Sequence, residues 1–217
     1  MELTKEQLQR VEHYLDKKEF NYIDLKLEIL DHMISDIESC INREHSFEEA
    51  FKITILKWDK HFDETASFYF GLMYHEPSIL VKNASKIFKP FYFWYLTACF
   101  LPMLIFTNFK IVFPNLLNQL LYAISVFCLI YLLFIIVKNI RSNIKTTYSY
   151  ILKTQYYIIF NLIMFLSYSL LKLNYFNDEG NINGVFLGFH IAGFAVTYIC
   201  HYFYKKHKET IKKYKIS

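Results

Sequence analysis

One predicted helix of the chain carries carboxylates and an imidazole on a single face. At about 100° per residue, this face of residues 22–41 holds Glu28, Asp31, His32 and Asp36. Such groups can bind a metal ion or transfer protons. The face has one histidine, so the paired-histidine pattern of zinc metalloproteases is absent. We predict no catalytic, cofactor or metal site. We interpret the face as a solvated charged surface, with contact to a protein partner as the functional alternative.

Polar residues also share faces within two long apolar runs. They are Asn161, Tyr168 and Lys172 in the third run, and His190, Thr197 and His201 in the fourth. Two such stripes can hydrogen-bond across a helical bundle, at about 0.6–2 kcal/mol per contact. We expect contacts between helices, with a pocket for a ligand or lipid headgroup as the alternative. No Asp or Glu lies inside the four apolar runs, which argues against a cation-coupled transporter.

Small residues form a third pattern in the fourth apolar run. Gly184, Gly188 and Ala192 recur at intervals of four, on the side away from His190. Stripes of this kind let two helices approach closely. We expect the partner to be a neighbouring helix of the same chain, with a second copy of the chain, and hence a homo-oligomer, as the alternative.

The apolar runs have the length of membrane spans. They cover residues 91–108, 117–137, 156–173 and 185–204, with one charge, Lys172, among them. A bilayer core needs about 20 apolar helical residues, within a range of about 17–25. Hydrophobic residues make up 54% of the 217-residue chain. These features exclude a single water-soluble globule and predict a four-helix transmembrane bundle over residues 91–204.

The charges are divided unevenly along the chain. Residues 1–80 hold 9 Lys and Arg against 17 Asp and Glu, whereas residues 81–217 hold 15 against 3. Thirteen of the later cations precede the first run, separate the second from the third, or follow the fourth. The positive-inside rule therefore predicts that both termini are cytoplasmic. The cations, including those of the tail 205–217, are expected on anionic lipid headgroups, and we predict no nucleic-acid binding because the soluble part is acidic.

The N-terminal region reads as a small all-α domain over residues 1–77. Thr4 with Gln7 and Ser46 with Glu49 form capping boxes that open helices at 5–18 and 47–62. A further helix at 22–41 is expected to bury the arc that faces away from the acidic face: Ile23, Leu27, Leu30, Ile34, Ile37 and Ile41. A short fourth helix is predicted over 64–74. Residues 78–90 form a basic junction helix, which either lies on the membrane surface or runs straight into the first span.

Residues 22–62 resemble a HAAS-type helical domain. The resemblance lies in Leu25-x-x-Glu28-x-x-x-His32-x-x-x-Asp36, followed by Ser46-Phe47-Glu48-Glu49-Ala50. Such domains commonly precede several membrane spans in bacterial proteins, and some are associated with PadR-like regulators. The resemblance implies a bacterial inner-membrane protein with a cytoplasmic protein-interaction domain and no catalytic activity.

Three functions remain open at this point. The first is a non-enzymatic inner-membrane protein whose acidic domain docks a cytoplasmic protein, in a regulatory or scaffold role. The second is an accessory subunit or small permease for a solute or lipid, which uses the polar faces of the third and fourth spans. The third is a membrane enzyme, for which a change of His32 or His190 would abolish activity. A further arrangement is self-docking, in which the acidic domain packs on the basic loop 138–153 of its own chain.

Overall fold

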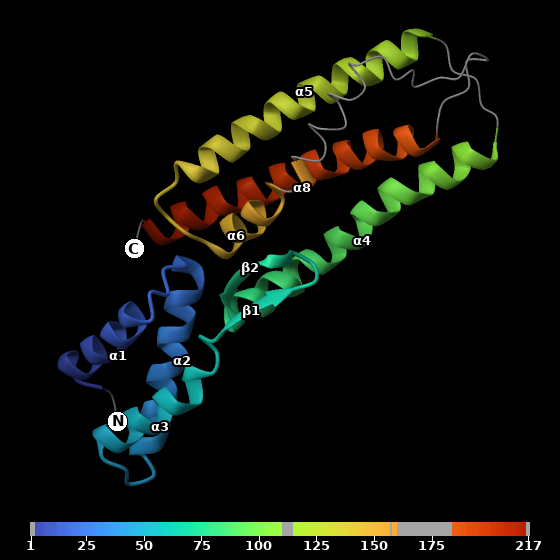
Figure 1. Cartoon of the computed structure of the whole chain (residues 1–217). Coiled ribbons are helices and arrows are strands. Elements are labelled where there is room, and N and C mark those ends of the chain that lie inside the picture. The colour runs from blue at the N-terminus through green and yellow to red at the C-terminus, as the bar shows by residue number, and fades with distance from the viewer. Residues whose placement is uncertain (1–2, 110–114, 157, 160–183, 216–217) are drawn as a thin grey trace. The chain divides into compact units, whose positions relative to one another are not determined.

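The computed structural model describes residues 3–109, 115–156, 158–159 and 184–215. These residues form seven helices and one two-stranded antiparallel sheet, which confirms the mostly helical fold predicted from the sequence (Figure 1). The chain divides into two compact units. The first unit contains residues 1–86, 143–150 and 207–217; the second contains residues 87–142 and 151–206.

Three helices of the first unit begin and end close to their predicted bounds. They are α1 (Lys5–Lys17), α2 (Ile23–Ile41) and α3 (Phe47–Asp59). Both capping boxes are present: Thr4 accepts from the backbone N–H of Gln7, and Ser46 accepts from that of Glu49. In return, the Gln7 side chain accepts from the backbone N–H of Thr4, and the Glu49 side chain accepts from that of Ser46. Two backbone donors that would otherwise be unpaired are therefore satisfied at the start of each helix.

The buried face of α2 differs from the predicted arc. Leu25, Ile29, Met33 and Ile37 are buried, whereas Leu27 is exposed. Of the six predicted core residues, only Ile37 is buried. Isoleucine and leucine occur around most of the circumference of α2, so several arcs satisfy helical periodicity. Packing against α1 and α3, which bury Val11, Leu15 and Ala50, selects the arc that is used.

The helix predicted over 64–74 is wrong, because this segment is a β-hairpin. Strand β1 (Glu64–Ser67) pairs antiparallel with β2 (Gly71–Pro77), with Ser67 opposite Gly71. Gly71 has φ +88°, a conformation that glycine adopts without steric cost and that follows naturally after a short hairpin loop. The aromatic residues around this glycine, Phe68, Tyr69, Phe70 and Tyr74, favour strands over helix.

Helix α4 (Ser78–Asn108) is continuous through the predicted junction and the first apolar run, although Pro90 and Pro102 lie inside it. This decides between the two expectations for residues 78–90: the junction runs straight into the first apolar run. The start of α4 is tied to the end of α3, because the Ser78 hydroxyl donates to the carbonyl of His61 at 3.2 Å.

The second unit contains most of the apolar helical residues. It includes α4 from Ile87 onward, all of α5 (Asn115–Ile140), half of α6 (Thr147–Thr154) and most of α8 (Gly184–Lys215). Helix α8 covers the predicted fourth span and continues through the basic tail. Helix α6 is an element that the sequence analysis does not predict. Within the described residues, two helices are long and apolar enough to cross a membrane, Ser78–Asn108 and Gln119–Ile140. Most of the predicted third span lies outside the described residues.

Large apolar side chains are exposed along both candidate spans. Trp94 and Leu104 of α4, and Phe127 and Ile130 of α5, each expose more than half of their surface. Soluble monomers rarely expose contiguous apolar surface on this scale, so these faces are suited to hydrocarbon.

Candidate functional site

The acidic face of α2 divides into one bonded residue and three exposed ones. The carboxylate of Asp36 accepts hydrogen bonds from Lys57 Nζ at 2.8 and 2.7 Å and from Trp58 Nε1 at 2.9 Å. Burial opposes the charged form of Asp36, but the hydrogen bonds from Lys57 and Trp58 outweigh it and lower the pKa of the carboxyl. Asp36 therefore joins α2 to α3.

The other three residues of this face, Glu28, Asp31 and His32, are exposed to solvent. No group of three His, Cys, Asp or Glu side chains in the described part of the chain is arranged to hold a metal ion. The exposed face is therefore a charged surface whose groups can form ion pairs with cations on another molecule.

A second polar cluster, which the sequence reading missed, lies at the other end of the same helix. The carboxylate of Asp24, in the first turn of α2, accepts the backbone N–H of Thr147 through both oxygens, at 3.1 and 3.0 Å. The N–H of Ile23 donates to the carbonyl of Lys145 at 3.0 Å, and Tyr22 forms a parallel bridge with Lys145. The start of α2 thus holds the segment that connects α5 to α6.

Buried side chains reinforce this contact. The hydroxyl of Thr146 lies 2.8 Å from Nδ1 of His207, and both side chains are buried. Tyr150 is buried with its ring at 5.2 Å from Phe70 and 6.5 Å from Tyr22. Burial raises the pKa of Tyr22, and the nearby carboxylate of Glu76 adds to the shift. We name this group of residues (Tyr22, Asp24, Thr146, Thr147, Tyr150 and His207) the loop clamp.

The loop clamp attaches part of the basic loop 138–153 to the N-terminal domain, which is the arrangement expected for self-docking. Residues 143–150 belong to the same compact unit as the N-terminal domain, as that arrangement requires. Their attachment, however, uses main-chain hydrogen bonds, a carboxylate accepting from a peptide N–H, and buried rings. The sequence does contain a local signal: Thr146 and Ser149 have capping spacing, and Ser149 N–H donates to Thr146 Oγ1 at 3.1 Å. It contains no signal that Asp24 is the distant partner.

The second unit has polar contacts between α5 and α8. Nδ1 of His190, which is buried, lies 2.7 Å from the hydroxyl of Ser125. Further along, Nδ1 of His201 lies 2.5 Å from the hydroxyl of Tyr131. Thr197 donates to the carbonyl of Gly193 in its own helix. The predicted partners on the third run, Asn161, Tyr168 and Lys172, lie outside the described residues.

The small-residue stripe faces α4 of the same chain. A Cβ added to Gly188 would lie 2.5 Å from the carbonyl oxygen of Cys99, and one added to Gly184 would lie 2.8 Å from Oγ1 of Thr107. Ala192 is buried one turn further on. The two glycines therefore permit a backbone approach that any larger residue would prevent, and in this structure the neighbouring helix is α4 of the same chain.

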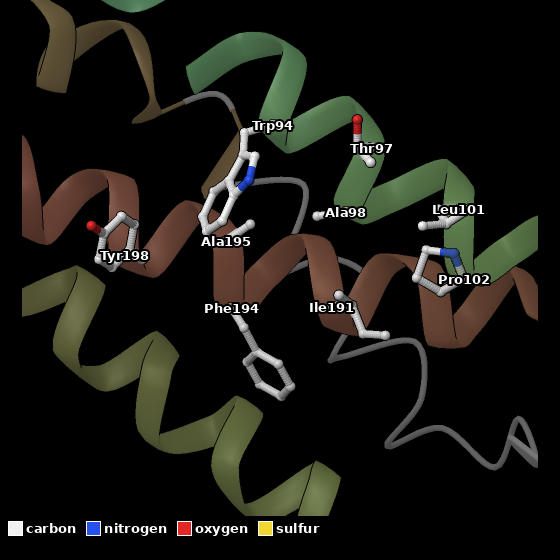
Figure 2. Close-up of a pocket in the computed structure, with 9 residues that line it drawn as sticks. All are labelled: Trp94, Thr97, Ala98, Leu101, Pro102, Ile191, Phe194, Ala195 and Tyr198. Atoms are coloured by element: carbon white, nitrogen blue, oxygen red, sulfur yellow. The ribbon is translucent and has the colours of Figure 1, made fainter. Parts of the chain in front are cut away.

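An apolar groove of about 500 Å³ lies between α4 and α8 beyond this stripe (Figure 2). Trp94, Leu101 and Pro102 line it from α4, and Ile191 and Tyr198 are among the lining residues from α8. The rings of Trp94 and Tyr198 lie 5.8 Å apart. The Thr97 hydroxyl, a polar group of the lining, already donates to the carbonyl of Phe93. The groove therefore offers dispersion contacts to hydrocarbon and little that would orient a polar substrate.

No protein-family model, curated protein or solved structure matches the chain. The resemblance of residues 22–62 to a HAAS-type domain stays a prediction.

Proposed function

We propose that this protein is a non-enzymatic, multi-pass inner-membrane protein whose N-terminal domain docks a cytoplasmic protein and transmits that contact to the membrane helices. One observation carries the proposal. Helix α2 bears the exposed acidic face, and the first turn of the same helix holds the segment between α5 and α6 through Asp24 and Thr147. A partner that shifts α2 would act on that segment through a direct hydrogen bond.

The chemistry of the partner follows from charge. Residues 1–80 carry a net charge of −8, and Glu28 and Asp31 are exposed on one face of α2. Complementary charge steers association and selects partners. We therefore propose that the partner presents a basic surface to this face.

The membrane arrangement is part of the proposal. Four spans at residues 91–108, 117–137, 156–173 and 185–204, with both termini cytoplasmic, agree with the apolar runs and with the positive-inside rule. The two helices that are long and apolar enough to cross a membrane support the first two spans. Under this topology the N-terminal domain, the segment between α5 and α6, and the basic tail all face the cytoplasm.

The test is affinity purification of the tagged full-length chain from native membranes after mild cross-linking. We expect a defined protein to be recovered with the unmodified chain. Its yield should fall by about tenfold, equivalent to about 1.4 kcal/mol of binding free energy, in Glu28→Lys/Asp31→Lys. Glu6→Lys/Glu12→Lys, at two exposed positions of α1, is the matched control because it changes the domain charge by the same amount without touching α2. Equal recovery from all chains would contradict the proposal.

A second candidate function rests on the polar contacts of the second unit. His190 is buried against Ser125 in a helix pair that otherwise offers mainly apolar side chains. Polar groups inside apolar helices often mark solute paths. If the protein is an accessory subunit or small permease, then Asn161→Leu and His190→Leu will each reduce solute or lipid flux in reconstituted vesicles. Unchanged flux would remove this candidate.

A further inference from the structure

The β1–β2 hairpin exposes three large apolar side chains at its tip. Phe68 is 79% exposed, Leu72 is 77% exposed and Met73 is 90% exposed. They lie on both sides of Phe70 and Gly71, where the chain reverses. An exposed apolar cluster on a short two-stranded sheet requires a covering environment, because it contributes nothing to the core of its own unit.

The hairpin is fixed in place and does not project freely. Phe70, between the exposed residues, is buried against the ring of Tyr150. The Ser67 hydroxyl, at the start of the tip, accepts a hydrogen bond of 2.9 Å from the Ser85 hydroxyl in α4. Figure 1 shows the hairpin beside the first part of α4, in agreement with this bond.

This attachment sets the level of the tip along α4. Ser85 lies six residues before Phe91, the first residue of the uncharged run. At a rise of about 1.5 Å per residue, the uncharged run begins about 9 Å beyond Ser85 along the helix. Interfacial apolar groups penetrate about 5–10 Å into the headgroup and acyl boundary. Ser67, at the start of the tip, is therefore held at the level of α4 where the headgroup region of a bilayer crossed by this helix would lie.

Charge on the same helix agrees with this environment. Lys82 and Lys86 are exposed, lie on either side of Ser85 in the sequence, and form no ion pair in the described part of the chain. Cations near a bilayer surface are attracted to anionic headgroups. An anionic membrane offers both apolar chains for the tip and negative headgroups for the two lysines. A soluble protein partner would have to supply an apolar and an acidic surface side by side.

We propose that the hairpin tip, formed by Phe68, Leu72 and Met73, is a membrane-interface anchor that enters the headgroup boundary beside α4. The inference rests on the proposed passage of α4 through a bilayer. It adds a second attachment of the first unit to the membrane, besides its covalent continuation into α4. In this proposal the apolar tip contacts lipid, and Lys82 and Lys86 contact anionic headgroups.

The test places an environment-sensitive NBD fluorophore on single cysteines in the full-length chain, with Cys40, Cys99, Cys128 and Cys200 changed to alanine. Met73→Cys reports on the tip. Leu101→Cys, inside the candidate span, is the control for membrane passage. Leu56→Cys is the matched control for exposed apolar surface, because it is 63% exposed on α3, away from the hairpin. The labelled chains are reconstituted in phosphatidylcholine and phosphatidylglycerol vesicles, with and without spin-labelled lipid.

We expect blue-shifted emission and quenching by spin-labelled lipid at positions 73 and 101, with shallow labels quenching position 73 more strongly. Position 56 should show water-like emission without quenching. Quenching at 101 but not at 73 would overturn the anchor and leave the proposed membrane location intact. A blue shift at 73 without lipid quenching would mean that protein covers the tip, which also overturns it. Absence of quenching at 101 would overturn the membrane passage itself.

A second measurement keeps the four native cysteines in place, so it does not depend on a cysteine-free variant that folds. A photo-activatable benzoylphenylalanine is introduced at position 72 or 56 of the otherwise unmodified chain, and the adducts are identified by mass spectrometry. Lipid adducts at 72 but not at 56 support the anchor. Adducts to a second copy, to another protein or to no lipid at position 72 would contradict it.

Discussion

The carboxylate of Asp24 and the peptide N–H of Thr147 are joined by hydrogen bonds of 3.1 and 3.0 Å across 123 residues of sequence. The bond serves two helices. Asp24 lies in the first turn of α2, where a negative charge is favourable, and it satisfies a donor at the first residue of α6. The Asp24 side chain therefore adds to the backbone hydrogen bond between Ile23 and Lys145 in coupling α2 to the segment before α6.

Removal of this carboxylate should loosen the loop clamp. In Asp24→Ala, the N–H of Thr147 loses its acceptor, and loss of such a cap weakens stability by about 0.5–2 kcal/mol. We expect faster amide hydrogen exchange at residues 145–149 in the detergent-solubilised full chain. Asp31→Ala, exposed two turns further along α2, is the control and should leave that exchange unchanged. Equal exchange in both variants would show that Asp24 does not hold the segment.

The loop clamp should weaken in mild acid because of His207. Burial lowers the pKa of this imidazole in the folded chain, whereas an unfolded histidine has a pKa of about 6.5. The unfolded chain therefore binds more protons as the pH falls below about 6.5, and the folded state loses stability. Thermal unfolding of the full chain in detergent should show a lower midpoint at pH 5.5 than at pH 7.5.

The comparison with His207→Gln isolates this effect from the other histidines. Glutamine can still hydrogen-bond to Thr146 but does not titrate, so the difference in midpoint between the two pH values should be smaller in the variant. An identical pH dependence in both chains would exclude His207 as the acid-sensitive group.

The contact between α4 and α8 should not tolerate a side chain at Gly188. A Cβ there would meet the carbonyl oxygen of Cys99 at 2.5 Å, so Gly188→Leu must separate the helices, and such overpacking commonly lowers stability by about 1–3 kcal/mol. The buried thiol of Cys200 should react with a maleimide dye at a lower temperature in this variant. Val185→Leu, at an exposed position of α8, should leave the dye-labelling temperature unchanged.

The contact between α1 and α3 should be stabilised by Tyr14. Its hydroxyl donates to Asp59 at 2.9 Å, and Lys18 pairs with the same carboxylate at 2.5 Å. Burial raises the pKa of Tyr14, and the hydrogen bond to Asp59 adds to the shift, so the hydroxyl stays protonated as a donor at neutral pH. Tyr14→Phe should lower the free energy of unfolding by about 1 kcal/mol in denaturant titrations of the full chain. Tyr69→Phe, on the hairpin loop, is a control that leaves this hydrogen bond in place. A variant as stable as the unmodified chain would contradict a stabilising role for the bond.

Local patterns were sufficient for some elements of this fold. The helices opened by Thr4 and Ser46 were predicted because a capping box involves residues only three positions apart. The contact of Gly184 and Gly188 with a neighbouring helix follows from side-chain size at a fixed helical interval. In contrast, the helix predicted over 64–74 is wrong, because the signal for the hairpin depends on the backbone conformation of a single residue, Gly71.

The sequence by itself determined the division into an acidic helical region and long apolar helices, because charge and hydropathy are summed over many residues. The tertiary structure decided which residues act together. Only packing selected the buried arc of α2, placed Asp24 against Thr147 and Thr146 against His207, and held Phe68, Leu72 and Met73 outside the core. These contacts join residues far apart in the chain, and their partners depend on where helix ends meet in space, which no local spacing encodes.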